Sequence, residues 1–524
     1  MKSYKLFLPA LLAALVLAIY WNSLGNSYVW DDRINFSENP NIRNFPLVLH
    51  SLFSPQYTEV ARERYYRPLV TLSYALEYKV WGYRPVLSHA INLIFHAFNS
   101  ILIFVLLARL VPTWRIAAAA ALLFAAHPIQ TNCAAYVNGR MEILCTFFFL
   151  ISIILFIKIR DHSNKQKCFL PLSIISFVLA LLSKEMALTL PFILLILYFF
   201  FVKPASAPRL PTPDSKQLNI ENRKLKISNL NITIFAPYFL IAIGYLAFRF
   251  FYVGGSALQT QRSLTPYLTF LMMLKATVLY MKLLIYPVKL CADYFSLPVS
   301  VSILDKEILS SAGAIIAVLA FAVYGLWRNR LVFFSIFWFF ITLLPVMNII
   351  PLLTFVSEKF LYLPSIGFCI LLATIMHRAF EHQILRNKKI IFWLVMILVV
   401  GVYSQATIKR NAIWKNELIL FRDTAKCSPH SASIHVKYGN ELCRLGNCEE
   451  ALQEYEKALA LQTDAAIYCN MGEAYGRLGE YDKAAEAFQQ CLELEPENST
   501  ACERLSLALK LSGKPVKLLN SCKK

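Results

Sequence analysis

The sequence predicts an all-helical, polytopic membrane protein that ends in a helical repeat domain. Hydrophobic residues make up 57% of the 524 residues and charged residues only 16%, which is implausible for a soluble globular chain. Several apolar runs approach the roughly 20 residues that a helix needs to cross lipid. A repeat with a period of 33 residues lies near the C-terminus. We therefore expect a membrane domain at 1–404 and a helical repeat domain at 405–524.

The first apolar segment, residues 6–20, follows Lys2 and Lys5. Basic residues stay on the cytoplasmic side, so this segment is expected to deliver Asp31 and Asp32 to the opposite face. No small-residue cleavage pattern follows it, and further apolar segments do, so we expect it to remain as an anchor. The adjacent carboxylates become the first candidate site.

The pattern of apolar and basic segments predicts about eleven membrane spans. An odd number of spans places 405–524 on the same face as Asp31. Residues 203–231 are rich in Pro, Lys and Asn and predict a cytoplasmic linker. The expected spans lie near 6–20, 88–108, 116–128, 141–157, 169–183, 186–202, 233–253, 308–327, 331–350, 362–377 and 390–404.

Residues 268–287 are apolar enough to cross but carry Lys275 and Lys282 on one helical face. A full crossing would put the basic residues at 328–330 and 378–389 outside, against the usual distribution of positive charge. We therefore expect an interfacial or re-entrant segment here.

The net charge of +20 does not indicate a nucleic-acid-binding protein. Residues 404–524 contain 16 basic and 16 acidic residues, which leaves 36 and 16 in residues 1–403. The whole excess thus lies in the membrane part, where it marks cytoplasmic loops rather than a phosphate-backbone footprint. No nucleic-acid partner is expected.

The twelve cysteines form no zinc pattern, because no C-x-x-C occurs and Cys443 and Cys448 have no histidines at ligand spacing. Most are expected to be small apolar packing residues. Seven follow residue 404, so at least one of these is expected to be free or intermolecular if the region is oxidised.

The repeat is typical of tetratricopeptide helix hairpins. Leu445-Gly446, with Ala451, Tyr455 and Leu459, recurs 33 residues later as Leu478-Gly479, with Ala484, Phe488 and Leu492. Full repeats are expected at about 430–497, capped by helices near 415–427 and 499–511. Such repeats offer a concave face for an extended peptide, although a spacer role stays open.

Charged residues converge on the face that carries Asp31. The connections between predicted spans place Arg140 and Glu142 there, then Lys184 and Glu185, and finally Glu358 and Lys359. Ionisable residues at the membrane edge are candidates for a site. Structural roles stay open: Arg67 and Arg140 could be interfacial, Lys184 with Glu185 could be an ion pair, and His89 with His96 could pack between helices.

Several motifs together resemble the transmembrane and tetratricopeptide-repeat-containing protein family, relatives of the protein O-mannosyltransferases with the GT-C glycosyltransferase fold. The resemblance covers nearly the whole chain. Lys359 departs from it, because the family usually has Arg after the Glu. The motifs are Val29-Trp30-Asp31-Asp32 with Asn39-Pro40, Tyr66-Arg67-Pro68-Leu69, Ser88-His89-Ala90-Ile91-Asn92 with His96, His127-Pro128, Gly139-Arg140-Met141-Glu142, Ser183-Lys184-Glu185, and Glu358-Lys359 followed by Leu361-Tyr362-Leu363-Pro364-Ser365.

The resemblance implies a GT-C-like enzyme that moves a sugar, for example mannose, from a polyprenyl-phosphate carrier to a protein or other hydroxyl acceptor with inversion, on the non-cytoplasmic face. Asp31 would be the base, and Asp32 would orient the acceptor or hold a divalent metal if one is used. Arg67, Arg140 and Lys184 would bind the departing phosphate. The supporting residues would be Glu142, Glu185, His89, Glu358, Lys359 and Tyr362.

The expected partners are membrane lipid, the prenyl-phosphate sugar donor and a protein or peptide acceptor bound by the repeats. A bacterial cytoplasmic membrane is favoured over the endoplasmic reticulum. Two other classes stay open: a transporter of lipid-linked sugar, although no inverted repeats are evident, and a non-catalytic membrane scaffold.

Overall fold

The structure is a computed structural model that describes residues 4–51, 66–161, 166–201, 232–253, 265–294, 300–349, 354–381 and 388–515. In these ranges 83% of the residues are helical and no strand forms, so the all-helical prediction is confirmed. The expected linker at 203–231 lies outside the described residues.

The chain divides into two compact units. Unit 1 comprises residues 1–287, 300–354 and 358–411, and unit 2 comprises 288–299, 355–357 and 412–524. The expected boundary after residue 404 falls inside a helix that continues to Asn411. Two short segments from between the helices of unit 1 therefore belong to unit 2.

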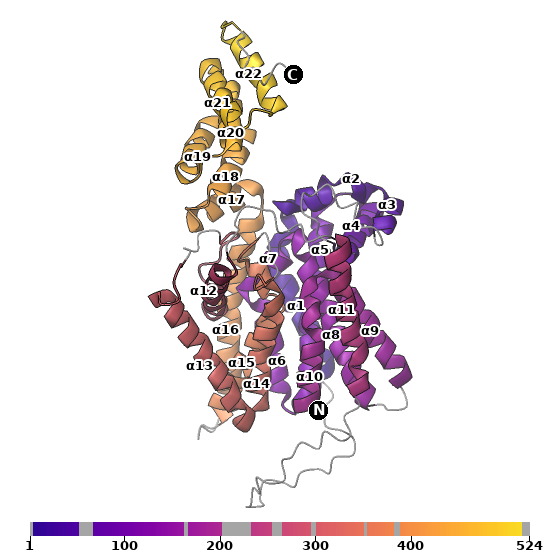
Figure 1. The fold of residues 1–524 in the computed structure, drawn as a ribbon. Helices are drawn as coiled ribbons and strands as arrows, with labels where there is room; N and C mark the ends of the chain where they lie inside the picture. The colour runs from indigo at the N-terminus through magenta and orange to yellow at the C-terminus, as the bar shows by residue number, and fades with distance from the viewer. Residues whose placement is uncertain are drawn as a thin grey trace, which may run out of the picture. The chain divides into compact units, whose positions relative to one another are not determined.

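Unit 1 is a helical bundle in which α5, α8 and α9 run side by side and the short helices α2, α3 and α4 gather at one end (Figure 1). Prolines in the first turns of α4, α5 and α12 fix φ where no backbone donor is needed. The helices are α1 (Tyr4–Tyr20), α2 (Pro40–Arg43), α3 (Phe45–Ser51), α4 (Pro68–Trp81), α5 (Pro85–Leu110), α6 (Trp114–Ala126), α7 (Thr131–Ala134), α8 (Arg140–Asp161), α9 (Gln166–Ser183), α10 (Leu190–Phe200), α11 (Ala236–Phe248), α12 (Pro266–Ile285), α13 (Lys306–Arg328), α14 (Arg330–Leu343), α15 (Ser365–Glu381) and α16 (Lys388–Asn411).

Each of the eleven apolar segments expected to cross the membrane contains a helix. Among the described residues, six helices are long and apolar enough to span, or seven if the bent pair of α6 and its continuation to Ala134 counts as one. The shorter apolar helices include α9, α10, α11, α14 and α15. A multi-pass membrane protein follows, while the number of eleven spans stays a prediction.

Helix α12 is continuous over 20 residues and is long and apolar enough to cross a membrane. Its expected interfacial or re-entrant placement stays a prediction. Lys275, one of the two lysines behind the interfacial expectation, is buried, and its Nζ lies 2.6 Å from Oε2 of Glu307 at the start of α13. Ion pairing of this kind makes a buried lysine tolerable.

Unit 2 contains a leading helix, two antiparallel hairpins and a trailing helix. These are α17 (Glu417–Cys427), α18 (Ala432–Arg444), α19 (Cys448–Leu461), α20 (Ala465–Arg477), α21 (Tyr481–Leu494) and α22 (Ser499–Leu511). Glycines 33 residues apart allow the hairpins to close: Gly439 faces the ring of Tyr455, and Gly472 faces the ring of Phe488. The predicted repeats and their flanking helices are confirmed.

The cysteines of unit 2 correct the sequence expectation. Disulfides join Cys291 to Cys427, Cys443 to Cys448 and Cys469 to Cys491, and Cys502 is also disulfide-bonded. The prediction that most cysteines are packing residues is therefore wrong. The odd number of cysteines after residue 404 does not require a free or intermolecular cysteine, because Cys427 pairs with Cys291, which lies before that residue.

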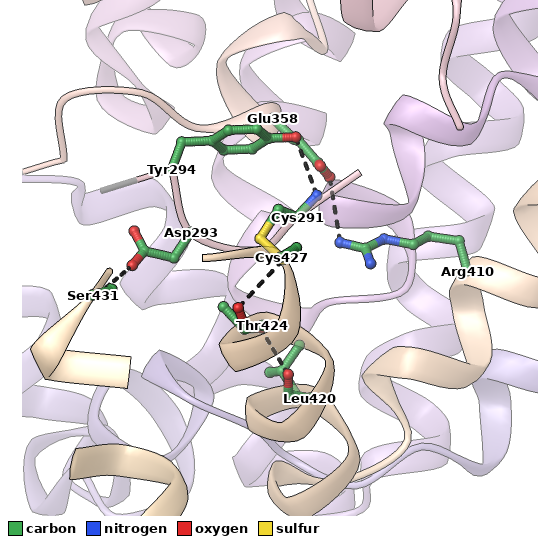
Figure 2. The surroundings of a disulfide bond; sticks show 9 residues. All are labelled: Cys291, Asp293, Tyr294, Glu358, Arg410, Leu420, Thr424, Cys427 and Ser431. Carbon is green, nitrogen blue, oxygen red and sulfur yellow. Dashed lines mark hydrogen bonds and ion pairs between the residues drawn. A yellow bond between two sulfur atoms is a disulfide. The ribbon is translucent and has the colours of Figure 1, made fainter. Parts of the chain in front are cut away.

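The first of these disulfides fastens residues 288–294 to the leading helix α17. Figure 2 shows Cys291 bonded to Cys427, with the hydroxyl of Ser431 donating to Oδ2 of Asp293 at 3.0 Å. The Cys291 backbone N–H donates to the hydroxyl of Tyr294 at 3.1 Å. A segment that follows α12 in the chain is thus a covalent part of unit 2.

The glycine contacts predict a stability difference between two substitutions in α20. A Cβ on Gly472 would lie 2.8 Å from the buried ring of Phe488, whereas a Cβ on Gly476 meets nothing within 4 Å. Gly472→Ala should destabilise unit 2 by about 1–3 kcal/mol through overpacking. Gly476→Ala, the matched control, should leave stability unchanged or raise it by up to about 1 kcal/mol. Hydrogen exchange in α20 and α21 of the full-length protein measures both, and equal protection in the two variants would contradict the packing.

Candidate active site

The Asp31-Asp32 pair follows a residue with an uncommon backbone conformation. Trp30 has φ of +53°, a region that a bulky L-residue occupies at a cost of about 1–2 kcal/mol. A π-helical turn, Arg33–Ser37, begins directly after Asp32. Strained or irregular backbone of this kind is concentrated at functional sites.

The two carboxylates occupy different environments. Asp32 is buried, and its oxygens accept from the backbone N–H of Asn138 at 2.6 Å and of Val29 at 3.2 Å. Burial raises the pKa of Asp32 well above its ordinary value, although these hydrogen bonds act in the opposite direction. Asp31 is only partly buried, and its Oδ2 lies 3.4 Å from Nδ2 of Asn138. Asp32 therefore anchors the loop, and Asp31 presents the accessible carboxylate.

The turn that carries Asn138 is built for close approach. A Cβ at Gly139 would overlap the backbone of Cys133, so only glycine fits there. Asn92 of α5 donates to the carbonyls of Tyr136 at 3.0 Å and Val137 at 3.3 Å. These contacts hold the turn at residues 137–139 in place independently of its hydrogen bonds to Asp31 and Asp32.

Arg140 lies fully inside unit 1 and is bound on all sides. Its Nη1 lies 2.6 Å from Oε2 of Glu77, its Nε donates to Oδ1 of Asn92 at 2.9 Å, and its Nη2 donates to the carbonyl of Ser88 at 3.1 Å. The guanidinium also lies over the Tyr74 ring, 4.6 Å from its centroid. These contacts favour a role in holding α4, α5 and α8 together over a direct contact with substrate.

Lys184 and Glu142 form a second buried ion pair. Both side chains are 1% exposed. The ammonium of Lys184 also lies 5.0 Å from the centroid of the Phe360 ring. Each charge is therefore neutralised within the bundle.

Glu185 is the centre of a more accessible cluster. Nη2 of Arg67 lies 3.1 Å from its Oε1, and Nη1 of Arg249 lies 3.4 Å from its Oε2. The side chains of Arg67, Arg249 and Glu185 are 16%, 23% and 10% exposed. Nη1 of Arg67 also approaches Sδ of Met141 at 2.7 Å, next to Arg140. The cluster therefore adjoins the turn that binds Asp32.

The histidine and tyrosine candidates lie among the helices. His89 is buried in α5, beside the backbone of Asn26 and Ser27. The hydroxyl of Tyr362 lies 2.7 Å from Nδ1 of His96 and accepts from Nδ2 of Asn99 at 3.1 Å. Tyr362 thus links the segment before α15 to α5.

Glu358 and Lys359 belong to a short 3-10 turn, Glu358–Leu361. Glu358 is fully buried, and Arg410 at the end of α16 lies 3.8 Å from its Oε2 (Figure 2). The backbone carbonyl of Lys359 lies 3.8 Å from Sγ of Cys133. This turn contacts the segment between α6 and α8.

The contacts join most of the predicted site residues through shared partners. Asp31 and Asp32 contact the 137–139 turn, and Arg67 contacts Met141, two residues after that turn. Sequence reasoning missed Glu77 and Arg249 as charged partners. The available signals were Glu77, a lone carboxylate in the apolar stretch 68–81, and Arg249, which directly follows the apolar stretch 236–248. Charges in apolar stretches require partners.

The described residues do not form a ligand set for a protein-held divalent metal. Among the described residues, no group of three or more His, Cys, Asp or Glu side chains is placed to hold one. Both oxygens of Asp32 accept backbone N–H groups, and Asp31 is the more accessible carboxylate of the pair.

The bundle and its repeats define the class: a multi-pass membrane protein with a tetratricopeptide-repeat unit. A family model described as tetratricopeptide repeat matches residues 465–498, and one described as TPR repeat matches 439–479.

The similar proteins agree with the resemblance drawn from the motifs. The chain is 27% identical over 477 residues to the protein O-mannosyl-transferase TMTC3 of Mus musculus. The matched region covers 87% of this chain and 51% of that protein. It is 27% identical over 470 residues to the protein O-mannosyl-transferase F38B6.6 of Caenorhabditis elegans, covering 86% and 62%. The resemblance to this family is thereby confirmed, and the chain spans about half the length of the first of these relatives.

A solved structure is also similar, the oligosaccharyltransferase of Archaeoglobus fulgidus in its apo form. The TM-score is 0.41 with 11% sequence identity, covering 78% of this chain and 56% of that one.

The buried Arg140–Glu77 pair predicts a large stability effect. Glu77→Gln keeps the side-chain shape but leaves the Arg140 charge without its counter-ion, and loss of one partner of a buried pair costs about 3–5 kcal/mol. Glu38→Gln is the matched control, because Glu38 pairs with Arg33 at the surface and is 53% exposed, where pairs contribute about 0–1 kcal/mol. Thermal unfolding in detergent measures both, and equal midpoints would contradict the framework role of Arg140.

Proposed function

We propose that the protein is a membrane glycosyltransferase of the GT-C type that moves a sugar from a polyprenyl-phosphate carrier to a hydroxyl acceptor. The main observation behind this proposal is that the two adjacent carboxylates differ. Asp31 is partly accessible, whereas Asp32 is buried and hydrogen-bonded to the 137–139 turn. The curated relatives named above are protein O-mannosyl-transferases, which supports mannose and a protein acceptor.

The transfer needs one base and one leaving group. The acceptor oxygen attacks the anomeric carbon and forms the new C–O bond, while its proton passes to the Asp31 carboxylate. The bond between the anomeric carbon and the phosphate oxygen breaks, and its electron pair stays with the phosphate. Attack from the face opposite the phosphate inverts the anomeric centre.

The leaving phosphate gains negative charge and needs fixed positive charge beside it. Arg67 is the best placed of the three predicted ligands, because its side chain is 16% exposed. Arg140 and Lys184 are 1% exposed and paired with Glu77 and Glu142, so we assign them to positioning the site. Glu185 holds the Arg67 guanidinium in place.

The disulfides support a non-cytoplasmic location for unit 2, because disulfides persist in oxidising compartments. Cys291 and Cys427 must lie on the same side of the membrane. Between them the chain passes through α13, α14, α15 and α16, and an even number of crossings returns it to that side. The repeats and the proposed transfer reaction then share the non-cytoplasmic face.

The tetratricopeptide repeats are proposed to recruit a protein or peptide acceptor. Stacked helix hairpins present a concave surface that suits an extended chain. The charge of residues 404–524 is balanced at 16 against 16, which disfavours attachment to anionic lipid by electrostatics. The repeats thus contribute acceptor binding rather than chemistry.

Loss of the proposed base should abolish most turnover. Asp31→Asn is expected to lower the transfer rate by about 10²–10⁴-fold while leaving donor affinity largely unchanged. Asp305→Asn, a carboxylate before α13, serves as the control and should transfer normally. The assay follows a radiolabelled sugar from polyprenyl phosphate to a peptide. Full activity of both Asp31→Asn and Asp32→Asn would rule out this mechanism.

Removal of the repeats should separate acceptor binding from chemistry. Deleting residues 430–524 retains Cys427 for its disulfide with Cys291. Transfer to a short synthetic peptide should persist, whereas transfer to a full protein acceptor should fall, because the chemical groups all precede residue 365. Equal losses on both acceptors would mean that the repeats only support the fold.

The two faces of the membrane can be assigned with native thiols. Cys168, at the start of α9, is exposed, and the basic residues around it predict the cytoplasmic side. In a Cys291→Ser variant, the released Cys427 thiol should react with an impermeant maleimide only from the non-cytoplasmic side. Cys168 should react only from the cytoplasmic side. Reaction of both thiols from one side would overturn the proposed topology.

A further inference from the structure

Arg249 is a partly buried arginine that contacts the same carboxylate as Arg67. Arg249 follows α11 and begins a π-helical turn, Arg249–Val253. Its Nη1 lies 3.4 Å from Oε2 of Glu185, the carboxylate that Arg67 also contacts. Two guanidiniums from distant parts of the sequence therefore share a single carboxylate.

This arrangement gathers two guanidiniums around one carboxylate. Glu185 is shared by Arg67 and Arg249, while the neighbouring Lys184 is paired with Glu142. The side chain of Arg249 is 23% exposed, so its charge is partly removed from water, where attraction to an anion is stronger than in bulk solvent. A guanidinium carries five donors in a planar fork that matches phosphate oxygens. The cluster therefore favours an anion beside Arg67 and Arg249.

Apolar and aromatic surface adjoins the two arginines. Phe250 and Phe251 directly follow Arg249 and are 70% and 78% exposed. On the other side, Tyr66 precedes Arg67, and its ring lies 5.2 Å from that of Phe248. In a helix that borders lipid, exposed aromatic rings contact hydrocarbon. A cationic pair next to such rings fits an amphiphile with an anionic head and a hydrocarbon tail.

The cluster is also connected to the carboxylates. Arg67 contacts Sδ of Met141 at 2.7 Å, and Met141 lies in the segment that follows Asn138, the partner of Asp31 and Asp32. A phosphate bound by the arginines would thus lie on the side of the bundle that carries the 137–139 turn and the proposed base, Asp31.

We propose that Arg249 acts with Arg67 to bind the phosphate of the polyprenyl carrier, and that Phe250 and Phe251 contact its prenyl chain. This assignment rests on the proposed function, because the carrier phosphate is the leaving group of that reaction. Glu185 bridges the two guanidiniums and orients them. As the bond from the phosphate oxygen to the anomeric carbon breaks, the phosphate gains charge and its attraction to both arginines increases.

The test measures binding of undecaprenyl phosphate, without sugar or acceptor, to the full-length protein in nanodiscs. Arg249→Gln should weaken binding by about 10–100-fold, the size expected for loss of a charge-assisted hydrogen bond. Arg249→Lys, which retains the charge but lacks the fork, should have an intermediate affinity. Arg378→Gln is the matched control, because Arg378 is exposed and donates to the carbonyl of Arg328 at 3.2 Å. It should bind as the wild type does.

Undecaprenol, which lacks the phosphate, separates head-group binding from packing. Arg249→Gln should bind it as the wild type does. Wild-type affinity of Arg249→Gln for undecaprenyl phosphate would overturn the proposal, and so would an equal loss for both lipids. If Arg249→Gln does not fold, the same comparison with Arg249→Lys decides. Arginine-dependent binding without transfer to any acceptor would instead refute the proposed function and leave the phosphate site standing.

Discussion

The buried ion pair between Arg140 and Glu77 is the interaction on which the rest of the site depends. Arg140 begins α8, Glu77 lies in α4, and Asn92 and Ser88 of α5 receive the other guanidinium donors. Asn92 also binds the carbonyls of the 137–139 turn, whose Asn138 N–H binds Asp32. A fully hydrogen-bonded network of this kind has one favourable geometry. The orientation of Asp31, the accessible carboxylate, therefore depends on the buried Arg140–Glu77 ion pair.

The sequence predicted the helices and the repeats because both depend on local patterns. Apolar runs and a 33-residue period can be recognised in a single sequence. The Asp31-Asp32 pair and the 139–142 segment were found through short motifs. The partners of the charges were not predictable in the same way. Glu77 and Arg249 stand alone in apolar stretches, and only the packing of α4, α8 and α11 shows which opposite charge each one meets. Arg140 and Lys184 were expected to bind phosphate because sequence records their charge but not their burial.

The disulfides illustrate a second limit of sequence reasoning. Counting cysteines within residues 404–524 assumed that a domain is continuous in the chain. Unit 2 instead includes residues 288–299 and 355–357, and Cys427 bonds to Cys291 across a separation of 136 residues. The same bond ties a connection between α12 and α13 to the leading helix of the repeats. The bond is therefore internal to unit 2 and joins two segments that are far apart in the chain.

A structure of the protein with a polyprenyl-phosphate sugar bound would test whether Asp31 is the site of transfer. We expect the anomeric carbon to face the Asp31 carboxylate with room for an acceptor hydroxyl between them, and the phosphate to contact Arg67. The sugar should approach the 137–139 turn, and Arg140 should keep its pairing with Glu77. A donor bound at the opposite ends of the helices, beyond reach of Asp31, would contradict the glycosyltransferase mechanism.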